Sequence, residues 1–140
     1  GQHESALRYY EQSLALMRRL GNLQGMADVW RMKGRAYAAQ RRYDEALHCC
    51  RTSLAIAERQ RDELRLAGAW YLMAECFEGQ GCLRDAVDLL AKVVRVDEKY
   101  RFPKLEENTR RLEALRAKLD GNGQAALSRK DSPSGRGARP

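Results

Sequence analysis

The sequence predicts an all-α fold, a stack of antiparallel helical hairpins, and three observations support this prediction. Ala6, Ala46 and Ala86 lie 40 residues apart, and so do Trp30 and Trp70. Self-similarity at a fixed period is the signature of a repeat architecture. Within each period the apolar residues return at helical steps, without the alternation of a strand. The length of 140 residues fits a single domain or part of a repeat array.

One helix type is predicted in the blocks 1–20, 41–60 and 81–100. In the middle block the apolar positions are Ala46, Leu47, Cys50, Leu54 and Ile56, at steps i, i+1, i+4, i+8 and i+10. The corresponding positions are Ala6, Leu7, Tyr10, Leu14 and Leu16 in the first block, and Ala86, Val87, Leu90, Val94 and Val96 in the third. This spacing covers one broad face of an α-helix. Cys50 is expected to be a small apolar core residue.

A second helix type is predicted between these blocks. Its apolar or small positions are Ala27, Trp30, Gly34 and Tyr37, matched by Ala67, Trp70, Ala74 and Phe77. Asn22 and Asp62 stand just before these helices, where a side-chain oxygen can accept from the free N–H groups of the first turn. Short turns at 39–41 and 79–81 favour antiparallel neighbours.

These residues resemble the tetratricopeptide repeat. Its pattern is found in Trp30-x2-Lys33-Gly34-x2-Tyr37, followed by Ala46-x3-Cys50. The same pattern returns in Trp70-x2-Met73-Ala74-x2-Phe77 and Ala86-x3-Leu90, while Ala6-x3-Tyr10 is similar to the second helix of an earlier unit. Small residues are expected where paired helices cross, with Gly34 or Ala74 opposite Ala46 or Ala86. The resemblance covers residues 1 to 100. The period is longer than the usual unit of about 34 residues, and is similar to the repeats of G-protein-signalling modulators and kinesin light chains.

The resemblance implies a right-handed α-superhelix that binds protein partners on a concave surface lined by the first helix of each hairpin. It implies partner-binding roles for Arg31, Met32, Arg35, Tyr71, Leu72 and Glu75 on that surface. We expect Arg31 and Arg35 to hold an acidic group, because they lie one turn apart, and Met32, Tyr71 and Leu72 to offer apolar area. The competing interpretation is that the two arginines belong to an ordinary solvated face.

The ends of the array differ from its middle. A capping helix is predicted at 101–119, starting after Pro103, because Leu105, Leu112, Leu115 and Leu119 form an apolar stripe. A dimeric coiled coil is the alternative, although the stripe is short for one. Residues 120–140, rich in Gly and Ser, are expected to form a disordered basic tail. Leu7, Tyr10, Leu14 and Met17 are expected to be partly uncovered, so the natural protein is expected to continue upstream with more repeats.

The charge does not identify a nucleic-acid-binding protein. The net charge is +7, but residues 1–100 hold 16 Lys and Arg against 14 Asp and Glu, so the excess lies in the last 40 residues. Such a tail more often reflects solubility or weak attraction to acidic partners than a binding module. No run of residues is long and apolar enough for a membrane span.

Catalytic and metal sites are not predicted. His3 and His48 are the only histidines. Asp44 lies one turn before His48, but Cys49 does not share their face, so no nucleophile joins them. The sequence has no phosphate-binding loop or paired-cysteine metal motif, and no cofactor is expected. The four cysteines form no C-x-x-C motif and are interpreted as reduced thiols of a cytoplasmic protein.

The predicted function is therefore a protein-binding scaffold or adaptor without enzymatic activity. An RNA-binding helical solenoid and a purely structural spacer are the alternatives left by the sequence.

Overall fold

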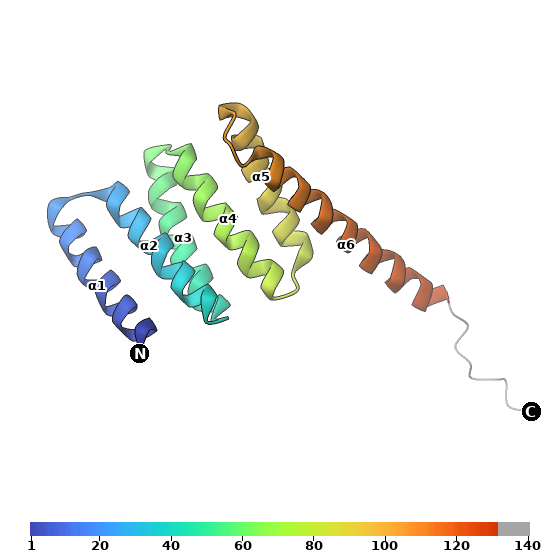
Figure 1. The fold of residues 1–140 in the computed structure, drawn as a ribbon, viewed down its shortest axis with the longest axis horizontal. Coiled ribbons are helices and arrows are strands. Elements are labelled where there is room, and N and C mark those ends of the chain that lie inside the picture. The colour runs from blue at the N-terminus through green and yellow to red at the C-terminus, as the bar shows by residue number, and fades with distance from the viewer. Residues whose placement is uncertain (132–140) are drawn as a thin grey trace, which may run out of the picture.

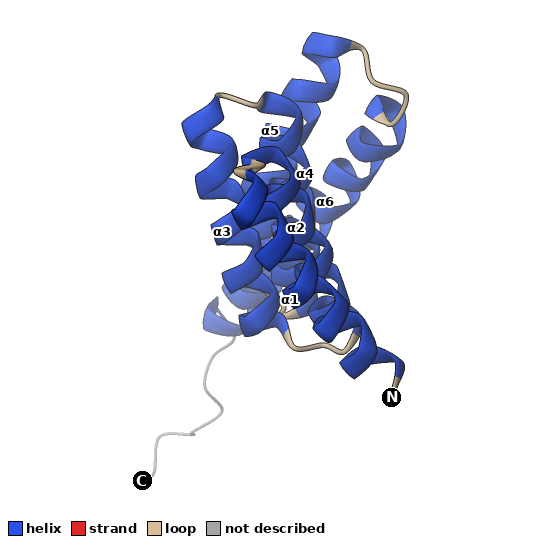
Figure 2. Ribbon diagram, turned by 90° about the vertical axis from the view of Figure 1, so that its left-hand side faces the viewer, coloured by secondary structure: helices blue, strands red, loops and turns tan. Residues whose placement is uncertain are grey.

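The computed structural model describes residues 1–131 of the chain, with side chains described up to residue 123. Six helices follow one another in the described part, and Figure 2 shows helices joined by short loops, with no strand among these residues. The helices are α1 (Gln2–Leu20), α2 (Leu23–Ala39), α3 (Tyr43–Gln60), α4 (Glu63–Gly79), α5 (Leu83–Tyr100) and α6 (Leu105–Asp131). The all-α prediction is confirmed.

Consecutive helices pack against each other, so the chain forms a solenoid of antiparallel hairpins (Figure 1). The backbones of α2 and α4, both fully described, also approach each other closely, whereas those of α3 and α5 do not. A stack of hairpins curves toward the side on which its helices approach each other, so α2 and α4 form the inner side of the curve. In Figure 1, α6 diverges from α4 along its length.

Each chain reversal takes place at a residue with positive φ, and these residues recur every twenty positions. They are Gly21, Arg41, Arg61, Gly81 and Arg101, with φ between 52° and 78°. Glycine reaches this left-handed region without cost, whereas a side chain on the backbone is strained there. The sequence pattern predicted the turns at 39–41 and 79–81, but not that three arginines would occupy this conformation.

The repeat register is confirmed by the core. The repeated positions of the first helix type are completely buried at Ala46, Cys50, Ala86 and Leu90. Tyr37 of α2 packs against the cluster of Ala46 and Cys50, and Phe77 of α4 packs against both clusters. Gly34 lies at a close crossing of α2 and α3: a Cβ added there would come within 3.2 Å of the Ala46 carbonyl oxygen. The small residues are therefore required by the approach of α2 to α3, as expected.

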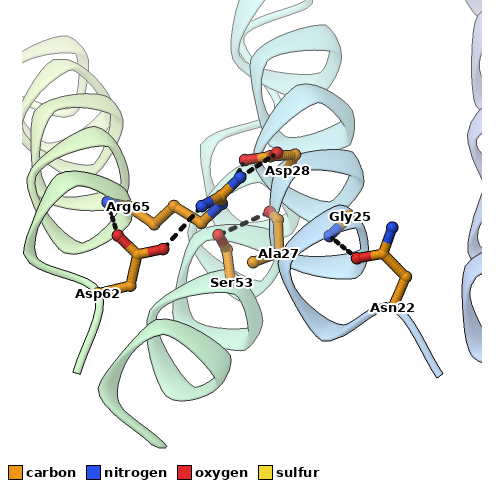
Figure 3. Close-up of polar contacts among 7 residues, drawn as sticks. All are labelled: Asn22, Gly25, Ala27, Asp28, Ser53, Asp62 and Arg65. Carbon is orange, nitrogen blue, oxygen red and sulfur yellow. Dashed lines mark hydrogen bonds and ion pairs between the residues drawn. The ribbon is translucent and has the colours of Figure 1, made fainter. Parts of the chain in front are cut away.

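Polar contacts cap the second helix type and join neighbouring helices (Figure 3). Asn22 caps α2 by accepting a hydrogen bond of 2.8 Å from the Gly25 N–H, and Asp62 caps α4 in the same way from Arg65. The buried Ser53 hydroxyl donates to the Ala27 carbonyl oxygen at 2.8 Å. The two predicted caps are confirmed, whereas the Ser53 contact was not predicted, because nothing in the apolar pattern shows which carbonyl lies opposite.

The ends of the array depart from expectation in two respects. On α1, Leu7, Tyr10 and Met17 are partly exposed as expected, but Leu14 is buried. The last helix begins at Leu105 and continues to Asp131, although an end at 119 and a disordered tail from 120 were predicted. A glycine inside a helix costs only about 1 kcal/mol relative to alanine, so Gly121 and Gly123 do not end α6. Residues 132–140 of the predicted tail lie outside the described residues.

Candidate protein-binding groove

A hollow of about 300 Å³ lies on the inner side of the solenoid, between α2, α4 and the segment that leads into α6. We call it the cationic groove. Its lining residues are Arg31, Arg35, Gly68, Tyr71, Leu72, Glu75 and Lys104. Three cations and one carboxylate therefore face the same hollow.

The structure brings five of the six sequence-predicted residues together in this groove. Met32 is the exception: it is 42% exposed but does not line the hollow. Leu72 lines it but is only 3% exposed, because it packs into the core with Ala46 and Cys50. The expectation that Leu72 offers apolar area to a partner is therefore corrected, since its side chain already stabilises the contact between α3 and α4.

Arg31 owes its position to a glycine on the neighbouring helix. Its side chain runs across Gly68, where an added Cβ would lie 3.3 Å from the Arg31 Cδ. The missing side chain lets the guanidinium lie against α4, half buried, while Arg35 one turn later is exposed. No ion pair joins Arg31, Arg35 or Lys104 to an acidic group within the described residues, so their charges are available to a ligand.

The acidic side of the groove is neutralised by a residue that the sequence analysis did not select. Arg111, on α6, donates to the Tyr71 hydroxyl at 2.8 Å and to Glu78 at 2.7 Å, and lies 3.5 Å from Glu75. Its guanidinium also lies over the Tyr71 ring, 5.2 Å from the centroid. Burial lowers the pKa of Arg111, but the hydrogen bond to Glu78 and the nearby charges raise it more, so the group is fully charged.

Lys104 and Arg111 were missed because the 40-residue register was taken to stop after Val96. The signal was nevertheless present in the sequence. Arg111 follows Tyr71 by 40 residues, as Tyr71 follows Arg31, so extending the period would have placed it beside the groove. Lys104 carries no such signal, because it lies in the connection between α5 and α6, and α6 starts at Leu105, two residues later than the 40-residue period predicts.

The candidate catalytic pair does not form a hydrogen-bonded dyad. The Asp44 carboxylate accepts a hydrogen bond from Gln80 at 3.2 Å, and the exposed His48 ring packs edge-on against Trp30 with 6.2 Å between ring centroids. No group of three or more potential metal ligands occurs among the described residues. Within the same part of the chain, none of the helices has both the length and the apolar character that crossing a bilayer requires.

Three of the four cysteines are core residues. Cys49, Cys50 and Cys76 are buried, and Cys82 is exposed at the start of α5. A hydrogen bond with Cys76, together with burial, raises the pKa of the Cys50 thiol, and burial raises that of Cys49. The same hydrogen bond lowers the pKa of the Cys76 thiol, although burial acts in the opposite direction. The thiols of Cys49 and Cys50 are consequently protonated and poor nucleophiles at neutral pH.

The fold and the groove define a repeat solenoid, the class of protein that presents side chains on a fixed curved surface. Two overlapping segments, residues 1–59 and 25–99, match the family model of the tetratricopeptide repeat, and the chain belongs to this family. No curated protein matches the chain. Tetratricopeptide repeats generally mediate protein–protein interactions, and their all-α fold is typically that of a scaffold without catalytic activity.

Proposed function

We propose that this chain is a scaffold or adaptor that binds an acidic segment of a partner protein in the cationic groove. The observation that carries the proposal is the trio Arg31, Arg35 and Lys104, which line one hollow and have no acidic partner among the described residues. Two neighbouring guanidinium groups suit a carboxylate, to which each can donate two parallel hydrogen bonds.

The rigidity of the solenoid supports affinity in such a site. The groove residues stand on helices whose ends are capped and whose neighbours are tied by buried contacts, so the receptor loses little conformational entropy when it binds. Tyr71 is held by Arg111 and therefore offers a fixed aromatic surface. Met32 lies outside the hollow and would contact only a partner that extends beyond it.

The proposal includes a cytoplasmic location. Three of the four cysteines are buried as free thiols, an arrangement typical of proteins in a reducing compartment.

The test is a selection of random twelve-residue peptides displayed on phage against the full chain. We expect the selected peptides to be rich in Asp and Glu, and we expect the double variant Arg31→Glu, Arg35→Glu to lose them. The matched control is Arg18→Glu, Arg19→Glu, which reverses two exposed charges on α1, outside the groove. Circular dichroism checks that both variants keep their helices.

Three results would contradict the proposal. Acidic peptides that bind both double variants equally would place binding elsewhere. A selection without any enrichment would favour the structural spacer. Tight binding of single-stranded RNA that falls by decades with added salt, and is lost on removing residues 120–140, would favour the RNA-binding solenoid.

A further inference from the structure

A second hollow, which we call the apolar pocket, adjoins the cationic groove. It lies between α4, α5 and the connection from α5 to α6, and has a volume of about 270 Å³. The walls are mainly apolar and come from Leu64, Ala67, Tyr71, Val93, Phe102 and Pro103. Small-molecule sites begin at about 300 Å³, so this pocket fits one bulky side chain better than a cofactor.

The two hollows share part of their lining. Gly68, Tyr71 and Lys104 line both the cationic groove and the apolar pocket. One short peptide can therefore place a carboxylate beside Arg31 and Arg35 and the next accessible side chain in the pocket. The shared wall is fixed, because Arg111 holds the Tyr71 hydroxyl at 2.8 Å from the side of α6.

The charges indicate which kind of side chain enters which hollow. Asp97 and Asn108 are the polar residues of the pocket wall besides Lys104; they are 5% and 4% exposed and are joined by a hydrogen bond of 2.8 Å. The Asp97 carboxylate disfavours an acidic side chain in the pocket, since like charges repel and a buried charge needs a partner. Acidic groups are thus directed to the cationic groove, and the pocket is left to an apolar group.

We infer that the partner segment combines acidic residues with one bulky apolar residue, such as Leu or Phe, whose side chain enters the apolar pocket while the acidic residues contact Arg31, Arg35 and Lys104. This inference rests on the proposed function, since it assumes that the acidic segment binds in the cationic groove. The added element is an apolar anchor next to the acidic residues.

The experiment uses the full chain and synthetic fluorescein-labelled peptides. Each peptide has three consecutive glutamates in a Gly/Ser background, and each flanking position in turn carries Leu, Phe or Ala. We expect Leu or Phe at one flanking position to strengthen binding roughly tenfold over Ala, as burial of one apolar side chain predicts. Fluorescence anisotropy measures the dissociation constants.

Two matched variants locate the anchor. Leu64→Gln makes the rim of the pocket polar, and because Leu64 is 61% exposed this change leaves the fold intact. Leu20→Gln is the control, on an equally exposed leucine of α1 (67%) away from the pocket. We expect the gain from Leu or Phe to disappear in Leu64→Gln and to persist in Leu20→Gln.

The outcomes separate this inference from the proposed function. In one outcome the glutamate peptides bind, they bind more weakly to the double variant Arg31→Glu, Arg35→Glu, and peptides with Leu or Phe bind no more tightly than those with Ala. This result supports the cationic groove and overturns the apolar anchor. A gain that survives Leu64→Gln overturns the anchor as well. If no glutamate peptide binds, or if the double variant binds them as well as the natural chain does, both the proposed function and the anchor fail.

Discussion

Arg65 holds Asp28 through two parallel hydrogen bonds, from Nε to Oδ1 at 3.0 Å and from Nη2 to Oδ2 at 2.9 Å, and so ties α4 to α2 (Figure 3). A third donor of the same guanidinium, Nη1, reaches Asp62 at 2.7 Å. Only a planar guanidinium presents donors in this fork, so lysine is not an equivalent replacement.

Arg65→Lys is therefore expected to lower the free energy of unfolding by about 1 kcal/mol, the upper end for a partly exposed ion pair. Urea denaturation followed by circular dichroism measures the change. Arg59→Lys, an exposed position near the end of α3 with no ion pair among the described residues, is the control and should leave the midpoint unchanged. Equal midpoints for Arg65→Lys and the natural chain would show that the fork adds nothing to stability.

Acid should weaken the fold through Asp62. The side-chain hydrogen bond from Arg65 lowers the pKa of Asp62 below its ordinary value of 3.8, although burial acts in the opposite direction. A carboxyl whose pKa is lower in the folded state stabilises that state above its unfolded pKa. This contribution is lost as the pH falls from about 4 through the folded value.

Urea midpoints measured from pH 7 down to pH 2.5 test this linkage. Asp62→Asn should be less stable than the natural chain at pH 7, and the difference should shrink below pH 4, because asparagine does not titrate. Glu63 contributes in the same direction, since the hydrogen bond from Lys99 lowers its pKa. A difference between the two chains that stays constant across this range would exclude a role for Asp62 ionisation.

Replacing the arginines at the helix ends is expected to raise stability, whereas the substitutions above lower it. Arg41, Arg61 and Arg101 have φ values of 59°, 52° and 53°, where a side chain on the backbone is strained and glycine is not. Replacing Arg61 or Arg101 by Gly is expected to stabilise the fold, by up to about 1 kcal/mol each. Thermal unfolding measures the gain.

A glycine placed just before such a turn should have the reverse effect. Arg59 lies in the last turn of α3, with helical backbone. Arg59→Gly is expected to destabilise by about 1 kcal/mol, because glycine is a poor helix former. If Arg61→Gly and Arg59→Gly shift the melting temperature in the same direction, the left-handed strain does not determine stability at these turns.

Residues that recur with the 40-residue period could be placed from the sequence, whereas residues outside the period could not. Ala46 and Ala86 are both completely buried, because each hairpin must bury the same face, so the sequence alone predicts their positions. Arg31 and Arg35 could be placed on the inner surface for the same reason. Lys104 could not, since it lies where the period breaks, and its position depends on how the connection after Arg101 turns.

Contacts between different repeats were harder to foresee than positions within one. Tyr71 and Arg111 share a register, but whether their side chains meet depends on the angle at which α6 leaves the stack. The burial of Leu72 was likewise not visible, because its helix position suits either the groove or the core. Periodicity shows the face of a helix but not the depth at which a side chain on the edge of that face lies.

Two glycines of the repeat should respond in opposite ways to the same substitution. An added Cβ at Gly34 would lie 3.2 Å from the Ala46 carbonyl oxygen and 3.3 Å from both the Cys49 Cβ and the Leu72 Cδ2, all on packed elements. An added Cβ at Gly68 would meet only the Arg31 side chain, at 3.3 Å from its Cδ. A flexible side chain can move aside, whereas a backbone carbonyl in a close helix crossing cannot.

Gly34→Ala is therefore expected to destabilise the fold by about 1 kcal/mol or more, because overpacking of typically 1–3 kcal/mol exceeds the gain in helix propensity. Gly68→Ala should instead stabilise by up to about 1 kcal/mol, the propensity gain alone. Because it displaces Arg31, Gly68→Ala should also weaken glutamate-peptide binding. Urea unfolding measures the effect on stability, and peptide anisotropy measures the effect on binding. If Gly68→Ala is more stable than the natural chain but binds the glutamate peptides equally well, Arg31 does not contribute to binding in the groove.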